Sequence, residues 1–147
     1  MFKAIWKLGI VDFEGIRDIR KRALVDYRGI DESLAFDPND QISAHLYVTT
    51  EEGAPIATAR IYPVENITRM GHIAVMPDFL GQGYEELSLR MMLYKAQKLS
   101  PELIQAYVME QDAPLYERMG FKLQTKAEPF SIYTINKSDI DLSGSCH

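Results

Sequence analysis

The fold depends on one stretch, residues 71–85, which reads GHIAVMPDFLGQGYE. Its apolar run, Ile73 to Met76, predicts a buried strand, and Pro77 ends that strand because proline has no N–H to donate to a sheet. A glycine loop, Gly81-Gln82-Gly83, follows and leads into a predicted helix. Together these parts form an anion pocket, because the first N–H groups of a helix point outward and glycines let a phosphate approach the backbone. The Gly-x-Gly pattern alone is equally compatible with an ordinary tight turn.

The residues before this stretch predict a helix and a meander of strands. Residues 1–8 alternate loosely and predict a first strand, and a helix capped by Asp12 is expected to run to about Tyr27. The helix should end at Arg28-Gly29-Ile30, and a polar segment with turn residues at Asp37-Pro38-Asn39-Asp40 follows. Further strands are expected over residues 44–50, 55–62 and 68–76, the first two joined by a hairpin turn at residues 51–53.

The residues after the stretch predict a helix, a parallel strand and a closing hairpin. The helix is expected from Gly83 to about Ser100, lying on the sheet through one apolar stripe. That stripe consists of Leu87, Met91, Tyr94 and Lys98, broadened by Leu89, Leu93 and Ala96. A strand over residues 103–109 should run parallel to the core strand, because a helix connects the two. A short helix over residues 114–119, capped by Gly120, should lead to a hairpin of residues 121–124 and 130–135.

Composition is that of one globular domain. The chain has 147 residues, of which 46% are hydrophobic and 25% charged, and its formal net charge is −5. We expect a single domain over residues 1–137 and a loose tail over residues 138–147. The negative charge argues against nucleic acid as a partner and is compatible with a cationic amine substrate. The lone cysteine, Cys146, indicates a reducing cytoplasm, and no run approaches the roughly 20 apolar residues of a membrane span or the core of an export signal.

The stretch resembles the acyl-CoA-binding motif of the GNAT family of N-acetyltransferases. The family pattern is an apolar strand ending Val-x-Pro, then Arg/Gln-x-x-Gly-x-Gly/Ala opening a long helix; Val75-Met76-Pro77 and Gly83 match it. Residues 113–121, APLYERMGF, resemble the family's Leu/Phe-Tyr-x-x-x-Gly-Phe signature, and residues 55–61 resemble the strand before the core motif. The likeness is greatest to the small branch typified by the bacterial ElaA protein, which residues 20–30, 36–40 and 45–46 follow loosely.

The resemblance implies an α/β (α+β) fold with a mixed, mostly antiparallel sheet of about six to seven strands, splayed at its parallel pair and flanked by about four helices. It implies acetyl-CoA as acyl donor and a primary amine of a small molecule or peptide as acceptor, with no metal. In this family the pantetheine arm pairs with main chain in the splayed gap, here the backbone of Ala74, Val75 and Met76. The pyrophosphate would be bound by the amides of Gly81, Gln82, Gly83, Tyr84 and Glu85. The closing hairpin could pair across a homodimer.

Tyr116 is the candidate proton donor. It stands at the family's tyrosine position, where the phenol is proposed to protonate the CoA thiolate. An ordinary phenol with a pKa of about 10 facing a thiol with a pKa of about 8.5 is a workable acid at neutral pH. The alternative is a packed tyrosine whose hydroxyl is satisfied by backbone.

Two residues are candidate general bases. His72 lies on the core strand, on the same face as Ala74 and Met76, and an unperturbed histidine titrates near neutrality. Glu110 ends the next strand, where a carboxylate can draw a proton through water. Each has an alternative interpretation, as a structural histidine and as a solvated strand-end charge. Where the ElaA-like branch has Glu-Gln after the first helix, this chain has Tyr27-Arg28.

Three departures from the family pattern surround the expected cofactor. Leu80 stands at the Arg/Gln position and removes a donor near the phosphates, and Met109 replaces a frequent Asn or Gln. Glu85 stands at the last Gly/Ala position, where a carboxylate at ~4 Å from a phosphate charge would cost roughly 4 kcal/mol at an effective dielectric of ~20. The same carboxylate in a first helical turn contributes about 0.3–1 kcal/mol through the helix dipole.

Three interpretations remain open from the sequence. The first is a working acetyltransferase, since main-chain contacts tolerate changes of side chain. The second is a GNAT-fold binding or regulatory module that has lost its affinity for acetyl-CoA. The third is a different fold, in which Gly81-Gln82-Gly83 is a plain turn and the sheet does not splay.

Overall fold

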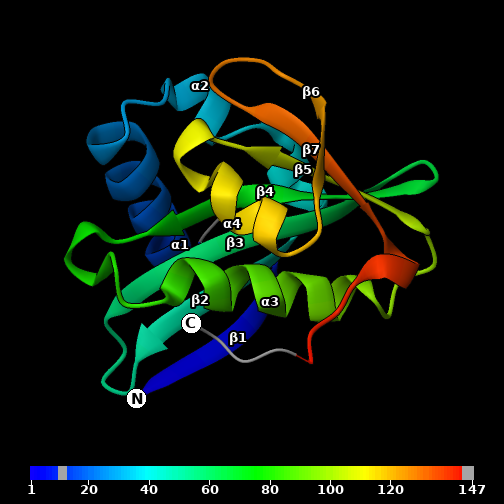
Figure 1. Ribbon diagram of the computed structural model, residues 1–147. Helices are drawn as coiled ribbons and strands as arrows, with labels where there is room; N and C mark the ends of the chain where they lie inside the picture. Colours follow the sequence, from blue (N-terminus) through cyan, green and yellow to red (C-terminus); the bar gives the residue numbers. More distant parts are fainter. Residues whose placement is uncertain (10–12, 144–147) are drawn as a thin grey trace.

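Seven strands form one sheet in the computed structural model, which describes residues 1–9 and 13–143 (Figure 1). The strands are β1 (Phe2–Leu8), β2 (Ala44–Thr50), β3 (Pro55–Val64), β4 (Ile67–Val75), β5 (Leu103–Val108), β6 (Lys122–Thr125) and β7 (Ser131–Asn136). Their order across the sheet is β1-β2-β3-β4-β5-β7-β6, and every neighbouring pair is antiparallel except the parallel β4–β5 pair. The predicted mixed sheet is confirmed, including the closing hairpin and the parallel strand after the helix.

Helices cover both faces of this sheet. On one face, α1 (Glu14–Arg20) continues as a π-helical segment, η1 (Lys21–Tyr27), and is followed by α2 (Glu32–Ala35) and the 3-10 segment η2 (Pro38–Ile42). On the other face, α3 (Tyr84–Ala96) and α4 (Ala113–Arg118) lie in front of the strands in Figure 1. Three short 3-10 segments complete the list: η3 (Pro77–Phe79), η4 (Glu110–Asp112) and η5 (Lys137–Asp139).

The two faces of β4 contribute to two separate apolar cores. Ile73 and Val75 pack in the core that contains Leu93 of α3 and the buried residues of α4. Ala74, between them, packs in the opposite core with Leu24 of η1 and Met109. Successive side chains of a strand point to opposite faces, which gives this alternation. Because both faces are buried, the end of β4 is an uninterrupted apolar run in the sequence.

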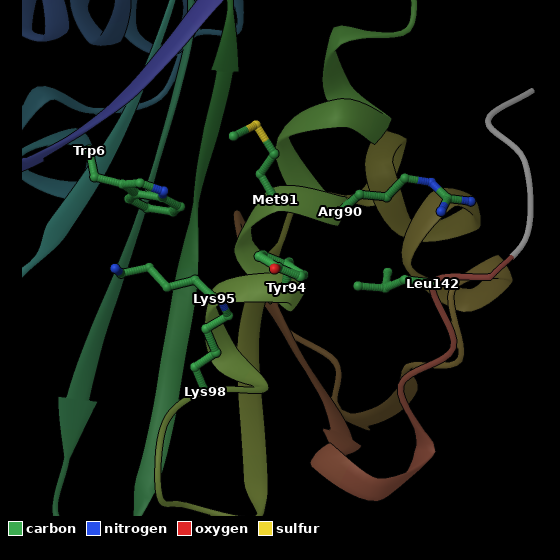
Figure 2. A pocket seen from close by; sticks show the side chains of 7 residues that line it. All are labelled: Trp6, Arg90, Met91, Tyr94, Lys95, Lys98 and Leu142. Carbon is green, nitrogen blue, oxygen red and sulfur yellow. The ribbon is translucent and has the colours of Figure 1, made fainter.

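The face that α3 turns to the sheet contains the residues expected only to broaden the predicted stripe, and not the centre of that stripe. Its fully buried apolar residues are Leu89, Met92, Leu93 and Ala96. In contrast, Tyr94 is 57% exposed, and Figure 2 shows it with Met91 and Lys98 around an outer hollow of about 460 Å³. The expected centre of the stripe was wrong because it contains a lysine and a tyrosine, whose polar ends remain in water; the expected Leu89, Leu93 and Ala96 face the sheet together with Met92.

The parallel strands separate along their length. The β4–β5 ladder pairs residues 67–70 with residues 103–106 and goes no further, although β4 continues to Val75 and β5 to Val108. The register between β3 and β4 also shifts between Thr58 and Arg60, and opposite this shift His72 has a φ of 53°. An extra residue of this kind bends and twists its strand. A gap therefore opens between the ends of β4 and β5, as the splayed sheet predicted, and the interpretation as a different, unsplayed fold is wrong.

The remaining differences concern short segments and the chain ends. The polar segment 31–41 contains α2 and η2, which were expected as turn only; Asp37 and Asp40 form a reciprocal capping box that starts η2. Helix α1 begins at Glu14 with Phe13 as its N-cap residue, and the expected cap Asp12, like Cys146, lies outside the described residues. Among the residues that the structure describes, no helix is both long and apolar enough to cross a bilayer.

Candidate functional site

The glycine loop presents an open backbone at the start of α3. Gly81 and Gly83 have φ angles of 76° and 89°, which glycine adopts without strain. A Cβ atom built at either position would meet no atom within 4 Å, so space lies above the loop. The first backward hydrogen bond of α3 runs from the N–H of Leu87 to the carbonyl of Gly83, 3.0 Å away. The earlier N–H groups of the first turn, which include those of Tyr84 and Glu85, have no intrahelical acceptor and are placed to bind an anion.

The first turn of α3 carries two carboxylates in different surroundings. Glu86 is buried and binds Arg118 of α4 at 2.6 Å and Arg90 at 3.0 Å, so it joins α3 to α4. Glu85 is half-buried, and its negative charge contributes to raising the pKa of Arg28. Gln82 is tied back to the loop, since its Nε2 donates to the carbonyl of Asp78 at 3.3 Å. The glycine loop and the helix start that the sequence predicted are thus present, and Glu85 lies within electrostatic range of Arg28, a cation that the sequence interpretation did not include.

Only part of the expected main chain of β4 faces the gap. The N–H of Met76 donates to the carbonyl of Ile56 in β3 at 2.8 Å, so this group is already used within the sheet. Ala74 pairs with Thr58 in the same antiparallel ladder. Because main-chain groups alternate in direction along a strand, the N–H and C=O of Val75, between Ala74 and Met76, point toward β5 and the gap. Val75 is therefore the member of the predicted trio whose backbone can pair with an arm lying between the strands.

Tyr116 lies in α4 on the α3 face of the sheet. Its side chain is buried, and its ring meets Phe121 edge-to-face with 5.2 Å between centroids. Burial raises the pKa of the Tyr116 phenol far above its ordinary value, Asp112 raises it further, and Arg28 acts in the opposite direction. The phenol is therefore protonated at every ordinary pH, as a proton donor must be before reaction, and the nearby Arg28 is the charge that makes it a better acid.

His72 lies on the opposite face of the sheet from Tyr116. Its ring stacks on Phe130 with 5.5 Å between centroids, and its Nε2 lies 2.8 Å from the carbonyl oxygen of Leu34. A carbonyl accepts, so Nε2 carries the proton and Nδ1, which is buried without a partner among the described residues, does not. Burial, and then the charges of Arg60 and Arg20, lower the pKa of His72 to about 3. At neutral pH this ring is neutral and only a weak proton acceptor.

Replacing His72 by asparagine, which tolerates a positive φ, should make the fold less sensitive to acid. The folded pKa of about 3 lies below the ordinary value of 6.5, so the contribution of His72 to stability is complete above pH 6.5 and is lost as pH falls toward 3. That loss is about 1.4 kcal/mol per pH unit inside this window. Urea unfolding between about pH 6.5 and 4.5 should show a steeper decline for the native protein than for His72→Asn. Parallel declines would mean that His72 does not titrate in this way.

Glu110 lies beyond the end of β5 and is exposed. It borders a hollow of about 190 Å³ between the start of α4 and the β6–β7 hairpin, whose lining includes Val108, Ala113, Leu123, Glu128, Ser131 and Tyr133. Phe130, beside this lining, is the residue that stacks on His72. Glu110 thus borders a hollow lined in part by Ser131, the neighbour of Phe130 in the chain, whereas Tyr116 belongs to the core on the α3 face. The structure does not bring the three candidates into one cluster.

Arg28 and Asp112 form an ion pair that the sequence did not predict. Arg28 ends η1, and Asp112 precedes α4; the two side chains make two hydrogen bonds, of 2.8 Å and 3.2 Å. The Nη1 group of Arg28 also donates to the sulfur of Met109 at 3.3 Å. In the sequence, this region differed from the family pattern at Tyr27-Arg28, in place of the ElaA-like Glu-Gln pair, and at Met109. Arg28 and Asp112 are 84 positions apart, and no local pattern predicts that they pair.

A second unpredicted cluster of charges is buried under α1. Arg20 and Arg60 are 0% and 1% exposed, and both contact Asp40, at 3.0 Å and 2.9 Å. Asp37 adds two contacts to Arg60, at 2.6 Å and 2.7 Å. The sequence signal for this cluster is an arginine in β3 with apolar neighbours on both sides, which places a charge in a strand buried on both faces.

A gap between parallel strand ends, beside a glycine loop and a helix N-terminus, is the arrangement of acyl-CoA-dependent N-acyltransferases. The family model for the acetyltransferase (GNAT) domain matches residues 43–123, which is more than half of the chain. The chain therefore belongs to the GNAT family, as the resemblance predicted.

Solved structures share the fold over nearly the whole chain. Escherichia coli ElaA is 14% identical, with a TM-score of 0.78 over 91% of this chain and 99% of that one. An acyl-CoA N-acyltransferase from Pseudomonas aeruginosa is 18% identical, with a TM-score of 0.79 over the same shares. The PaiA N-acetyltransferase from Thermoplasma acidophilum, solved in complex with coenzyme A, is 14% identical, with a TM-score of 0.70 over 92% of this chain and 99% of that one. At these identities the likeness establishes the fold.

Proposed function

We propose that this protein is an acetyl-CoA-dependent N-acetyltransferase that moves an acetyl group to a primary amine of a small molecule or peptide. The observation that carries the proposal is the separation of β4 and β5 beyond residues 70 and 106, where their ladder ends although both strands continue. The gap meets the glycine loop, where Gly81 and Gly83 leave open space above an unpaired first helical turn. An elongated ligand with a phosphate end and a narrow arm matches that combination, because one part binds anions and the other offers free backbone in a strand.

The proposed chemistry assigns one role to each part of the site. The Val75 backbone pairs with the pantetheine arm, and the amides around Gly83 bind the pyrophosphate. Acetyl-CoA, when bound, supplies the acetyl group as a thioester. Glu110 takes the proton of the attacking amine through water, because it is exposed at the strand end whereas His72 is a weak acceptor. Tyr116 gives its proton to the sulfur as the carbon–sulfur bond breaks, and the products are an amide and the free thiol of CoA.

The wider setting belongs to the same proposal. The lone cysteine of the sequence supports a reducing compartment such as the cytoplasm. Strand β6 lies at the edge of the sheet with all four residues exposed, so its free edge supports pairing across a homodimer. We take residues 1–137 as the acyltransferase domain and residues 138–147 as its tail.

The alternative is a GNAT-fold binding or regulatory module without catalysis. Leu80 and Glu85 favour it, because the first removes a donor from the phosphate loop and the second adds a negative charge. The backbone of the glycine loop weakens this case, because Gly81 and Gly83 leave the first-turn N–H groups accessible to a phosphate whatever the neighbouring side chains are. Arg28 does not offset the charge of Glu85, because Asp112 already pairs with its guanidinium.

Thermal unfolding with and without millimolar acetyl-CoA separates the two functions. A ligand present at 100 times its Kd adds about 2.7 kcal/mol to the free energy of unfolding, which raises the midpoint measurably. We expect a raised midpoint for the native protein and a larger rise for Glu85→Gly, because the substitution removes a charge next to the pyrophosphate. Glu14→Gly, which removes an exposed first-turn carboxylate from α1, is the matched control and should not change the shift.

Each other result points to a different conclusion. A rise only in Glu85→Gly would establish an acetyltransferase scaffold that has lost its cofactor, which is the alternative function. No rise in either protein would contradict the proposed use of acetyl-CoA altogether. With binding established, CoA release in a screen of primary amines and peptides would identify the acceptor, and a complete lack of release would favour the binding module.

A further inference from the structure

Arg28 lies at the mouth of the gap between β4 and β5. It ends η1, which packs beside η3, the segment that directly follows β4. From there its guanidinium reaches Met109, directly after β5, and Asp112, directly before α4. The guanidinium thus contacts the segment that follows β5, while η1, which Arg28 ends, packs beside the segment that follows β4. The arm of an acyl-CoA lying in the gap would end beside this guanidinium.

The guanidinium keeps donors available for a ligand. Asp112 accepts two of its hydrogen bonds and the Met109 sulfur a third, out of the five N–H groups of an arginine. The Nε–H and the second Nη2–H have no partner among the residues that the structure describes, and the side chain is 17% exposed. Asp112 therefore fixes the orientation of the guanidinium without using all of its donors.

The charge of Arg28 acts on two sides of the site. Burial alone lowers the pKa of Arg28, but the hydrogen bonds and charge of Asp112 raise it above its ordinary value, with a further contribution from Glu85. In turn, Arg28 lowers the pKa of Tyr116, against the effect of burial. The guanidinium is therefore permanently charged and lies within electrostatic range of both the phosphate loop and the candidate proton donor.

On the basis of the proposed function, we propose that Arg28 is a binding residue for the thioester end of acetyl-CoA, held in place by Asp112. Its free N–H groups donate to the arm in the gap, and its charge stabilises the sulfur as it becomes a thiolate. The contacts with Met109 and Asp112 indicate that Arg28 binds the thioester end of the cofactor and not its phosphate end. Both residues lie after the end of β5, next to α4, and not in the phosphate loop.

Calorimetric binding of two probes tests this placement. Adenosine 3′,5′-bisphosphate carries phosphates but no pantetheine arm, whereas acetyl-CoA has both. We expect Arg28→Met to weaken acetyl-CoA binding at least tenfold and to leave binding of the bisphosphate within a factor of two. Arg22→Met is the matched control: Arg22 of η1 pairs with Asp18 of α1 at 3.0 Å, both side chains are exposed, and the loss of Arg22 should change neither affinity.

A second measurement reports on the charge rather than on the contact. The thiol of bound CoA, followed by thiolate absorbance, should ionise at a lower pH in the native protein than in Arg28→Met, while Arg28→Lys should lie between them. In Arg28→Met, the carboxylate of Asp112 loses its partner, which could disturb the fold. The double variant Arg28→Met/Asp112→Asn removes that carboxylate charge as well, so it controls for misfolding and should bind acetyl-CoA as weakly as the single variant.

The outcomes separate this inference from the function on which it rests. If the native protein does not bind acetyl-CoA, both the proposed function and the role of Arg28 are wrong. If it binds and Arg28→Met binds equally well, only the role of Arg28 is wrong. Equal weakening of both probes would move Arg28 to the phosphate end and overturn its placement at the thioester.

Discussion

Replacing Tyr116 by phenylalanine should lower kcat for acetyl transfer by about 100-fold or more, with the KM for acetyl-CoA changed by less than about threefold. Positioned proton donors contribute about 10²- to 10⁴-fold to rates, and a group that acts only as the thiolate leaves affects kcat more than binding. The phenyl ring keeps the edge-to-face contact with Phe121, so the core around α4 should remain packed. Steady-state kinetics with the acceptor found in the amine screen measures this change.

Burial makes the proton transfer from Tyr116 demanding. It raises the pKa of the phenol, and each unit by which that pKa exceeds the value of the thiol costs about 1.4 kcal/mol for the transfer. Arg28 lowers the pKa of Tyr116, so the two residues should act together. We therefore expect the effects of Tyr116→Phe and Arg28→Met on kcat to be less than additive. The rate should also show no decline near pH 10, where an ordinary phenol would ionise.

A second tyrosine offers the control for this experiment. Tyr133 of β7 is also buried, and its hydroxyl lies 3.4 Å from a carboxylate oxygen of Glu117. Tyr133→Phe removes a hydroxyl from the same core at a residue to which the proposed chemistry gives no proton-transfer role, and its kcat should remain close to that of the native protein. If Tyr116→Phe kept kcat within about threefold, Tyr116 would be a packing residue, as the alternative interpretation of the sequence holds.

The elements that the sequence predicted well are those defined by local patterns. Strand β2 was expected over residues 44–50 and is found at Ala44–Thr50. The parallel course of β5 followed from the helix before it, and Gly120, with a φ of 103°, has the left-handed conformation expected of the cap. Periodicity, turn residues and glycines are properties of neighbours in the chain, so they can be read without knowing the fold.

What the sequence did not predict depends on contacts between distant segments. The choice between two apolar stripes on α3 was decided by the sheet beneath the helix, and the pairing of Arg28 with Asp112 by the approach of the end of η1 to the end of η4. The same is true of the site. The loop around Gly83 was predicted from its motif, whereas the direction of the Val75 backbone and the low pKa of His72 follow from packing around them.

Replacing Asp40 by alanine should destabilise the fold by about 3–5 kcal/mol. Asp40 lies between two buried guanidiniums, those of Arg20 and Arg60, and its loss leaves one of them without its carboxylate partner. Removing one partner of a buried ion pair costs about this much because the remaining charge stays out of water. Asp37 continues to bind Arg60 at 2.6 Å, so the cost falls mainly on Arg20, whose other contacts are with neutral groups, the carbonyl of Ala35 at 2.8 Å and Nδ1 of His45 at 3.4 Å.

The buried charge of Arg20 is only partly compensated even in the native protein. Burial lowers the pKa of Arg20 to about 10 even though Asp40 acts against that shift, so the guanidinium is incompletely compensated before any substitution. Urea unfolding at pH 7 should therefore show a much larger loss for Asp40→Ala than for Asp26→Ala. Asp26 pairs with Lys21 at 2.6 Å, but both side chains are about half exposed, and such surface pairs contribute about 0–1 kcal/mol. Equal losses for the two variants would mean that water or a shift of Asp37 compensates Arg20, and that the buried cluster is not what holds α1 and η2 against β3.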